Sequence, residues 1–81
     1  MADEIIIIYA TDWCWDCRRA RNFFDRRKIP YQWINIDRDI QAEKFVIETS
    51  HGNRSVPTII LPGGEILVEP SNQQLLDHFP E

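Results

Sequence analysis

The sequence predicts an α/β protein: a four-stranded mixed sheet with three helices in the order β-α-β-α-β-β-α. Three observations lead to this fold class. An apolar β-branched run directly precedes a segment with helical apolar spacing, a second strand pattern follows that segment, and two short apolar runs late in the chain flank a Pro-Gly-Gly turn. With 81 residues the chain has the length of one domain, and we expect residues 1–81 to form it.

The first strand and the first helix have the clearest patterns. Residues 4–9 are predicted to form a strand, and from residue 5 on they are apolar, as in a central strand covered on both faces. Residues 15–28 are predicted to form a helix that Pro30 ends, because proline cannot continue the helical hydrogen bonds. Four residues at helical spacing give this helix an apolar stripe: Cys17, Ala20, Phe23 and Phe24.

A second strand is expected over residues 31–37, with Tyr31 and Trp33 on one face and Ile34 and Ile36 on the other. Asp37 or Asp39 would cap a following helix over about residues 39–50. Gly52 is the residue expected to adopt the left-handed conformation that closes this helix. The inner face of the helix is formed by Ala42, Phe45, Val46 and Thr49.

The last two strands, over residues 58–61 and 65–68, form a hairpin around Pro62-Gly63-Gly64. Residues 71–74 fit a capping box that begins a last short helix, which buries Leu75, Leu76 and Phe79. A helical crossover joins the first two strands and makes them parallel. This is the minimal thioredoxin fold, and open α/β sheets of this kind place their sites at the carboxyl ends of the strands.

The two cysteines of the chain, Cys14 and Cys17, lie at that edge, between the first strand and the first helix. A thiol at a helix start faces unpaired backbone N–H groups and the positive end of the helix dipole, and both favour the thiolate. A thiolate attacks disulfides, and a second thiol one turn later can displace the first partner. The pair therefore predicts a redox site and a dithiol–disulfide oxidoreductase.

Other uses of the pair are weaker but stay open. A structural disulfide between cysteines this close would constrain the unfolded chain little. A zinc site needs four ligands, and His51 and His78 are not spaced as a second pair, so we expect no metal site from one chain. The main alternative is a metal or iron–sulfur binding module that uses the same cysteines from two chains, and a redox-regulated binding protein is a third.

Composition narrows the function classes. The net charge of −4 argues against a nucleic-acid partner, and no apolar run is long enough to span a membrane. Residues 1–4 are acidic where a signal peptide would be basic, so we expect a cytoplasmic protein. In the reducing cytosol a lone cysteine pair is more often catalytic than structural. We also expect a monomer.

Val56-Pro57 opens the third strand, where proline is tolerated because it has no N–H to donate to the sheet. A cis bond here would present the Val56 backbone N–H and C=O to an extended substrate, and an ordinary trans bond is the alternative.

The Cys-X-X-Cys after a hydrophobic strand, the later Arg-Ser-Val-Pro-Thr segment and the Gly-Gly after it resemble the glutaredoxin family. Residues 51–71 look most like its mycoredoxin branch. The resemblance implies a thiol–disulfide oxidoreductase with Cys14 as nucleophile, Cys17 as resolving thiol and a cis Val56–Pro57 bond beside them. It also implies that no cofactor is bound, and that the substrate is a protein disulfide or a mixed disulfide of a low-molecular-weight thiol. Mycothiol, glutathione or thioredoxin reductase would then be the electron donor.

The chain departs from glutathione-using glutaredoxins at two places. It has Trp15-Asp16 between the cysteines, where they commonly have Pro-Tyr, and Val68-Glu69-Pro70-Ser71-Asn72 where they usually have Gly-Gly and an acidic segment. We therefore expect glutathione to be a poorer partner than mycothiol, another small thiol or a protein disulfide.

Six residues near the cysteines are candidates for substrate contact. Trp13 and Trp15 flank Cys14 and would form a flat apolar platform, with Trp15 the more exposed of the two. Arg54 could pair with a substrate carboxylate, with an exposed loop arginine as the alternative. Together with Arg54, the segment Ser55-Val56-Pro57 could hold one end of the substrate.

Overall fold

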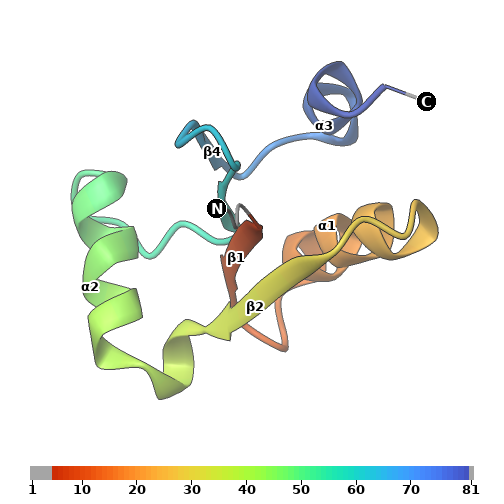
Figure 1. The fold of residues 1–81 in the computed structure, drawn as a ribbon. Helices are drawn as coiled ribbons and strands as arrows, with labels where there is room; N and C mark the ends of the chain where they lie inside the picture. The colour runs from red at the N-terminus through yellow and green to blue at the C-terminus, as the bar shows by residue number, and fades with distance from the viewer. Residues whose placement is uncertain (1–4, 81) are drawn as a thin grey trace.

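The computed structural model describes residues 5–80 and contains one four-stranded sheet in the order β2-β1-β3-β4 (Figure 1). Strands β1 and β2 are parallel, whereas β3 is antiparallel to both β1 and β4. This is the topology that the sequence predicts. The elements are β1 (Ile6–Ala10), α1 (Trp15–Arg26), β2 (Tyr31–Asn35), the 3₁₀ helix η1 (Ile36–Arg38), α2 (Ile40–Thr49), β3 (Thr58–Ile60), β4 (Ile66–Val68) and α3 (Asn72–His78).

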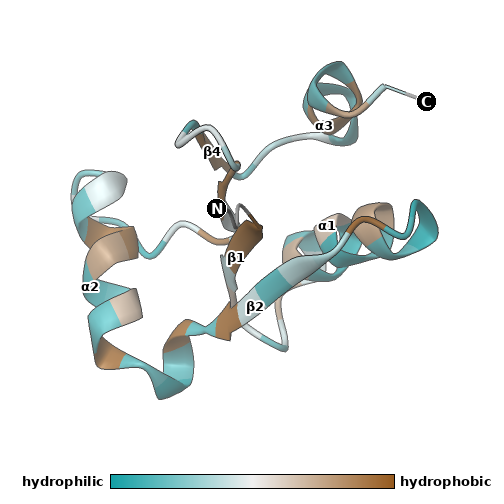
Figure 2. Ribbon diagram, in the orientation of Figure 1, coloured by the Kyte–Doolittle hydropathy of each residue, from teal (hydrophilic) through white to brown (hydrophobic). Residues whose placement is uncertain are grey.

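The helices cover both faces of the sheet, with α1 and α3 on one face and α2 on the other (Figure 1). Alternate residues of β1 therefore enter different cores: Ile8 packs with α1 and α3, and Tyr9 packs against α2. Phe24 and Leu75 are fully buried in the first core, and the apolar stripe predicted for α1 is buried there in full. Figure 2 shows the central strands as the most hydrophobic part of the ribbon.

The first helix ends two residues earlier than predicted. Lys28 adopts a left-handed conformation with φ of 57°. The Ile29 N–H donates to the Phe24 carbonyl at 3.0 Å and the Lys28 N–H to the Asp25 carbonyl at 3.1 Å, which is the Schellman pattern of a helix end. The predicted first strand begins at Glu4, and that residue lies outside the described part of the chain.

The connection from β2 to α2 is shorter in its strand than predicted, and it decides between the two predicted caps of α2. The strand ends at Asn35, because the Asn35 side chain accepts the Asp37 N–H at 2.9 Å and starts η1. Asp39, and not Asp37, caps α2 by accepting the Ala42 N–H at 3.0 Å. Asp37 is thereby available for contacts outside its own segment.

The close of α2 also corrects the prediction for Gly52. The left-handed residue directly after the helix is His51, with φ of 61°, and Gly52 follows with φ of 109°. The Gly52 N–H donates to the Ile47 carbonyl at 2.7 Å, so Gly52 is the second residue of the Schellman pattern.

The capping box of α3 is confirmed. The Ser71 hydroxyl accepts the Gln74 N–H at 3.1 Å, and the Gln74 side chain accepts the Ser71 N–H at 2.8 Å. Leu75 is buried by this helix, and Leu76 and Phe79 are partly buried.

Candidate active site

Cys14 is the N-cap of α1 and lies three residues after the buried Thr11, which directly follows β1. Its Sγ accepts the Cys17 N–H at 3.4 Å, and the Cys14 carbonyl accepts the Arg18 N–H at 3.1 Å. A helix start leaves such N–H groups without intrahelical partners, so the sulfur takes the position that a capping oxygen usually occupies. Cys14 is partly exposed.

Cys17 lies in the first turn of α1 and is fully buried in the core between α1 and the sheet. Burial is the main cause that raises the pKa of Cys17 from 9.0 to about 12, because the thiolate loses its hydration there. Hydrogen bonding and charge at Cys14 raise this pKa further, while the Thr11 backbone lowers it. Both cysteines are free thiols, one accessible and one enclosed.

The segment before β3 forms the other side of the site. The Val56–Pro57 peptide bond is cis, as the sequence predicts. The Cys14 thiol donates to the Val56 carbonyl at 3.8 Å, so the predicted proximity of this segment to the cysteines is also confirmed. Pro57 is fully buried, and its carbonyl accepts the Glu69 N–H at 2.8 Å. The partly exposed residues of this segment are Ser55 and Val56.

Asp37 connects the two sides of the site. One carboxylate oxygen, Oδ2, accepts the Trp13 indole N–H at 2.9 Å, and the other, Oδ1, accepts Arg54 Nη2 at 2.6 Å. The hydrogen bond from Arg54, followed by that from Trp13, holds the pKa of Asp37 below its usual value. Arg54 is held further by Glu43 at 2.7 Å. The loop before Cys14 and the loop before Val56 are thereby joined through one side chain.

Three of the predicted contact residues, the two indoles beside Cys14 and Arg54, have side chains whose surroundings the structure shows. Trp13 and Trp15 are both exposed, at 68% and 75%, so the surface beside Cys14 includes both indoles and not mainly Trp15. Arg54 lies on the other side, in the loop before Val56, and its guanidinium is engaged by two carboxylates, neither of which the sequence analysis assigned to it. Substrate contact by these residues stays a prediction.

Two residues of the site were missed by the sequence analysis. The backbone of Thr11, directly after β1, lowers the pKa of Cys17, and Asp37 links Trp13 to Arg54. Thr11 follows β1 and Asp37 follows β2, and these parallel strands end at the same edge of the sheet. Their position just after the strands was the signal in the sequence from which both residues could have been found. No group of three or more His, Cys, Asp and Glu residues that could hold a metal ion is found in residues 5–80. Within the same range, no helix is long and apolar enough to cross a membrane.

The fold and the site together define a thioredoxin-like protein with a Cys-X-X-Cys pair at the start of its first helix. Residues 6–66 match the family model of glutaredoxin, and the chain belongs to the glutaredoxin family. Membership places it, at the level of the family, among thiol–disulfide oxidoreductases.

Similar proteins support the same family. A protein of Mycobacterium tuberculosis named as a glutaredoxin is 32% identical over 75 residues, which cover 93% of this chain and 89% of that protein. Mycoredoxin 1 of Corynebacterium glutamicum is 37% identical over 65 residues, or 80% of each chain. The crystal structure of a glutaredoxin from Archaeoglobus fulgidus is 25% identical, with a TM-score of 0.71 and coverage of 94% of this chain and 86% of that one.

Proposed function

We propose that this protein is a dithiol–disulfide oxidoreductase in which Cys14 attacks the substrate disulfide and Cys17 resolves the resulting mixed disulfide. The observation that carries the proposal is the unequal exposure of two thiols within one helical turn. Cys14 is partly exposed at the helix start, and Cys17 is fully buried behind it. A substrate sulfur that approaches from solvent therefore meets Cys14 first.

The electrons and protons of the reaction balance as follows. The Cys14 thiolate attacks one sulfur of R–S–S–R′, the S–S bond breaks, and R′–S⁻ leaves and takes a proton from water. The Cys17 thiolate then attacks Cys14 Sγ, forms the Cys14–Cys17 disulfide and releases R–S⁻. Two electrons from an external thiol or reductase restore the two thiols.

The surroundings of Cys17 fit the order of these steps. Before the reaction, burial and the neighbouring Cys14 keep the Cys17 proton in place. Once Cys14 is bound in a neutral mixed disulfide, its negative charge is gone and it no longer accepts a hydrogen bond from the Cys17 thiol as a thiolate does, so two of the causes that raise the pKa of Cys17 disappear. The second thiol is thereby favoured to lose its proton only after the first has reacted.

We propose that the protein works with mycothiol, or reduces protein disulfides with electrons from a thioredoxin reductase, in preference to working with glutathione. The charged ends of glutathione need free donors at the start of the last helix. Here Pro70 has no N–H, and both the N–H and the hydroxyl of Ser71 are engaged in the capping box. The similarity to mycoredoxin 1 favours the same choice.

Turnover assays test the proposal. NADPH consumption is measured with a mycothiol mixed disulfide, with a glutathione mixed disulfide and with thioredoxin reductase, each for the wild type, Cys14→Ser and Cys17→Ser. We expect Cys14→Ser to be inactive in all three assays, and Cys17→Ser to accumulate a mixed disulfide on Cys14 that mass spectrometry detects. An active Cys14→Ser variant would refute the assignment of the nucleophile.

Two further outcomes discriminate between the alternatives. Efficient turnover with glutathione alone would overturn the preference for another donor. Stoichiometric iron or zinc in the purified protein, bound between two chains and without any turnover, would support the metal-binding alternative instead.

A further inference from the structure

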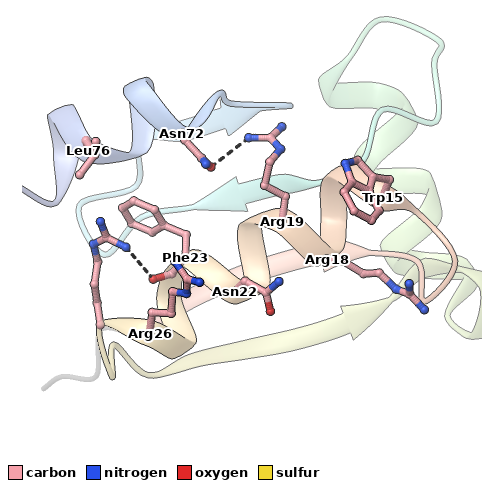
Figure 3. Close-up of a pocket in the computed structure, with 9 residues that line it drawn as sticks. Trp15, Arg18, Arg19, Asn22, Phe23, Arg26, Asn72 and Leu76 are labelled. Atoms are coloured by element: carbon pink, nitrogen blue, oxygen red, sulfur yellow. Dashed lines mark hydrogen bonds between the residues drawn. The ribbon is translucent and has the colours of Figure 1, made fainter.

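A basic groove of about 460 Å³ runs between α1 and α3, beginning at Trp15 beside Cys14 (Figure 3). Its apolar surface comes from Trp15, Phe23 and Leu76. Four of its lining residues are arginines of α1 and the turn after it: Arg18, Arg19, Arg26 and Arg27. The proposed chemistry at Cys14 and Cys17 does not use this groove.

Two of the arginines are fixed by neighbouring groups. Arg19 reaches from α1 to α3, where its Nη1 donates to Asn72 Oδ1 at 3.0 Å, and its Nη2 pairs with Asp16 at 3.2 Å (Figure 3). The guanidinium of Arg27 lies 3.8 Å from the Phe23 ring centroid and donates to the Phe23 carbonyl at 3.2 Å. Of these contacts, the hydrogen bond from Arg19 to Asn72 joins the two helices across the groove.

The other two arginines are available to a partner. Arg18 and Arg26 are exposed, and their guanidinium groups make no hydrogen bond or ion pair with any residue from 5 to 80. They are eight positions apart, which is about 12 Å along a helix. Their charges therefore do not converge on one point, as they would around a single phosphate, and they suit separate anionic groups along an extended ligand.

The charge of the chain is strongly divided between α1 with the turn after it and the rest of the chain. Residues 15–28 contain six of the nine Lys and Arg residues but only two of the 13 Asp and Glu residues. The remainder of the chain is correspondingly acidic. An acidic partner is therefore attracted to the groove and repelled elsewhere, which favours an approach that brings it next to Cys14.

We propose that this groove, called here the α1–α3 groove, docks an acidic extended segment of a protein whose disulfide is reduced at Cys14. The inference rests on the proposed function and adds the class of protein substrate. From Trp15 to Arg27 the groove follows about 18 Å of helix, the length of five or six residues of extended chain at about 3.3 Å each. Carboxylates would pair with the guanidinium forks, and apolar side chains between them would contact Phe23 and Leu76.

The test uses peptides that carry one cysteine as a 2-pyridyl disulfide, followed by four Glu, four Gln or four Lys residues. Attack by reduced protein releases pyridine-2-thione, and its absorbance gives the second-order rate constant in a single turnover. We expect the Glu peptide to react roughly tenfold faster than the Gln peptide and the Lys peptide to react more slowly than either, with the differences largely lost in 0.5 M NaCl.

Variants locate the effect in the groove. Arg26→Gln, which lies far from the sulfur, is expected to lower the rate of the Glu peptide about threefold and to leave the Gln peptide unchanged. Arg18→Gln should add a similar loss for the Glu peptide. The matched control is Arg38→Gln, an exposed arginine in η1 with the same change of charge, and it should leave the preference intact.

The outcomes separate this inference from the proposed function. If no peptide reacts, the proposed function fails. If all peptides react at the same rate, or if Arg38→Gln lowers the preference as much as Arg26→Gln, the docking proposal is wrong while the function stands. If Arg26→Gln slows the reduction of coenzyme A disulfide but not that of the Glu peptide, the groove serves a phosphate-bearing small thiol, and the proposed segment is likewise refuted.

Discussion

The burial of Cys17 leads to a quantitative prediction for the variant Cys14→Ser. In this variant Cys17 is the remaining cysteine, and its environment inside the first core is retained. Because burial is the largest cause of its raised pKa, we expect the thiol to stay protonated and unreactive near neutral pH even without Cys14.

The size of the effect follows from the two pKa values. At pH 8 an accessible thiol with a pKa of 9.0 is about one-tenth thiolate, whereas Cys17 with a pKa of about 12 is about one part in ten thousand. The ratio is about a thousandfold, equivalent to about 4 kcal/mol at 1.36 kcal/mol for each pKa unit. Restricted access to a fully buried sulfur lowers the rate further.

Alkylation with iodoacetamide, followed by intact-mass spectrometry from pH 7 to 10.5, measures this rate. The thousandfold ratio holds for the wild type, and Cys14→Ser lacks the contribution of Cys14 to this pKa while it keeps the larger contribution of burial. Folded Cys14→Ser is therefore expected to react more than about a hundredfold more slowly than an unstructured cysteine peptide, with a rate that still rises with pH at pH 10. Cys17→Ser, which leaves the accessible Cys14, is the matched control and should react much faster. In denaturant the two variants should become equal. A folded Cys14→Ser variant that reacts within tenfold of the peptide would show that the reasoning is wrong.

Two further predictions concern the contacts that hold the site and the last helix. Removing the cap with Ser71→Ala should lower the free energy of unfolding by about 1 kcal/mol in urea titrations. The control Gln73→Ala, in the same turn, should change it by only about a few tenths of a kcal/mol. Equal losses in the two variants would contradict the capping assignment. Because the pKa of Asp37 is lowered in the folded state, the stability that it contributes is fully present above its unfolded pKa, near 4, and is lost as the pH falls through the folded value. Asp37→Asn should therefore reduce the loss of Tm between about pH 5 and pH 3, and an unchanged pH profile in calorimetry would exclude this role.

Much of the fold could be predicted because local patterns and topology agree. The continuous apolar run of β1 and the four-residue stripe of α1 each fit one type of element. The stripe lies in the first core, and β1 contributes residues to both cores, as expected of a strand covered on both faces. The helical crossover then required β1 and β2 to be parallel. The ends of α1 and α2 were predicted less well, because Lys28 and His51 take left-handed conformations that glycine usually adopts.

In the candidate site, too, some residues could be predicted from the sequence and others could not. The cysteines and Val56-Pro57 could be predicted because their residue types have few other uses at these positions. The contacts of Asp37 could not, since they depend on how the loops after β1 and β2 and the loop before β3 fold. Ala10 and Asn35 are opposite each other in the parallel register, so the residues shortly beyond them, Trp13 and Asp37, meet at one edge. The register follows from topology, but the choice of Asp39 over Asp37 as the helix cap was decided locally.

The hydrogen bonds of Asp37 also bear on where an anionic substrate can be recognised. Arg54 is the basic residue nearest to Val56 in sequence, yet two carboxylates hold its guanidinium, so much of its charge is already compensated. Arg18 and Arg26 have no such partner among the described residues and lie along the groove that begins beside Cys14. Positive charge that can attract a substrate is therefore found on the α1 side of the sulfur. The Val56 side supplies backbone and apolar contacts, and this division favours a substrate that carries its acidic groups on one side of its disulfide.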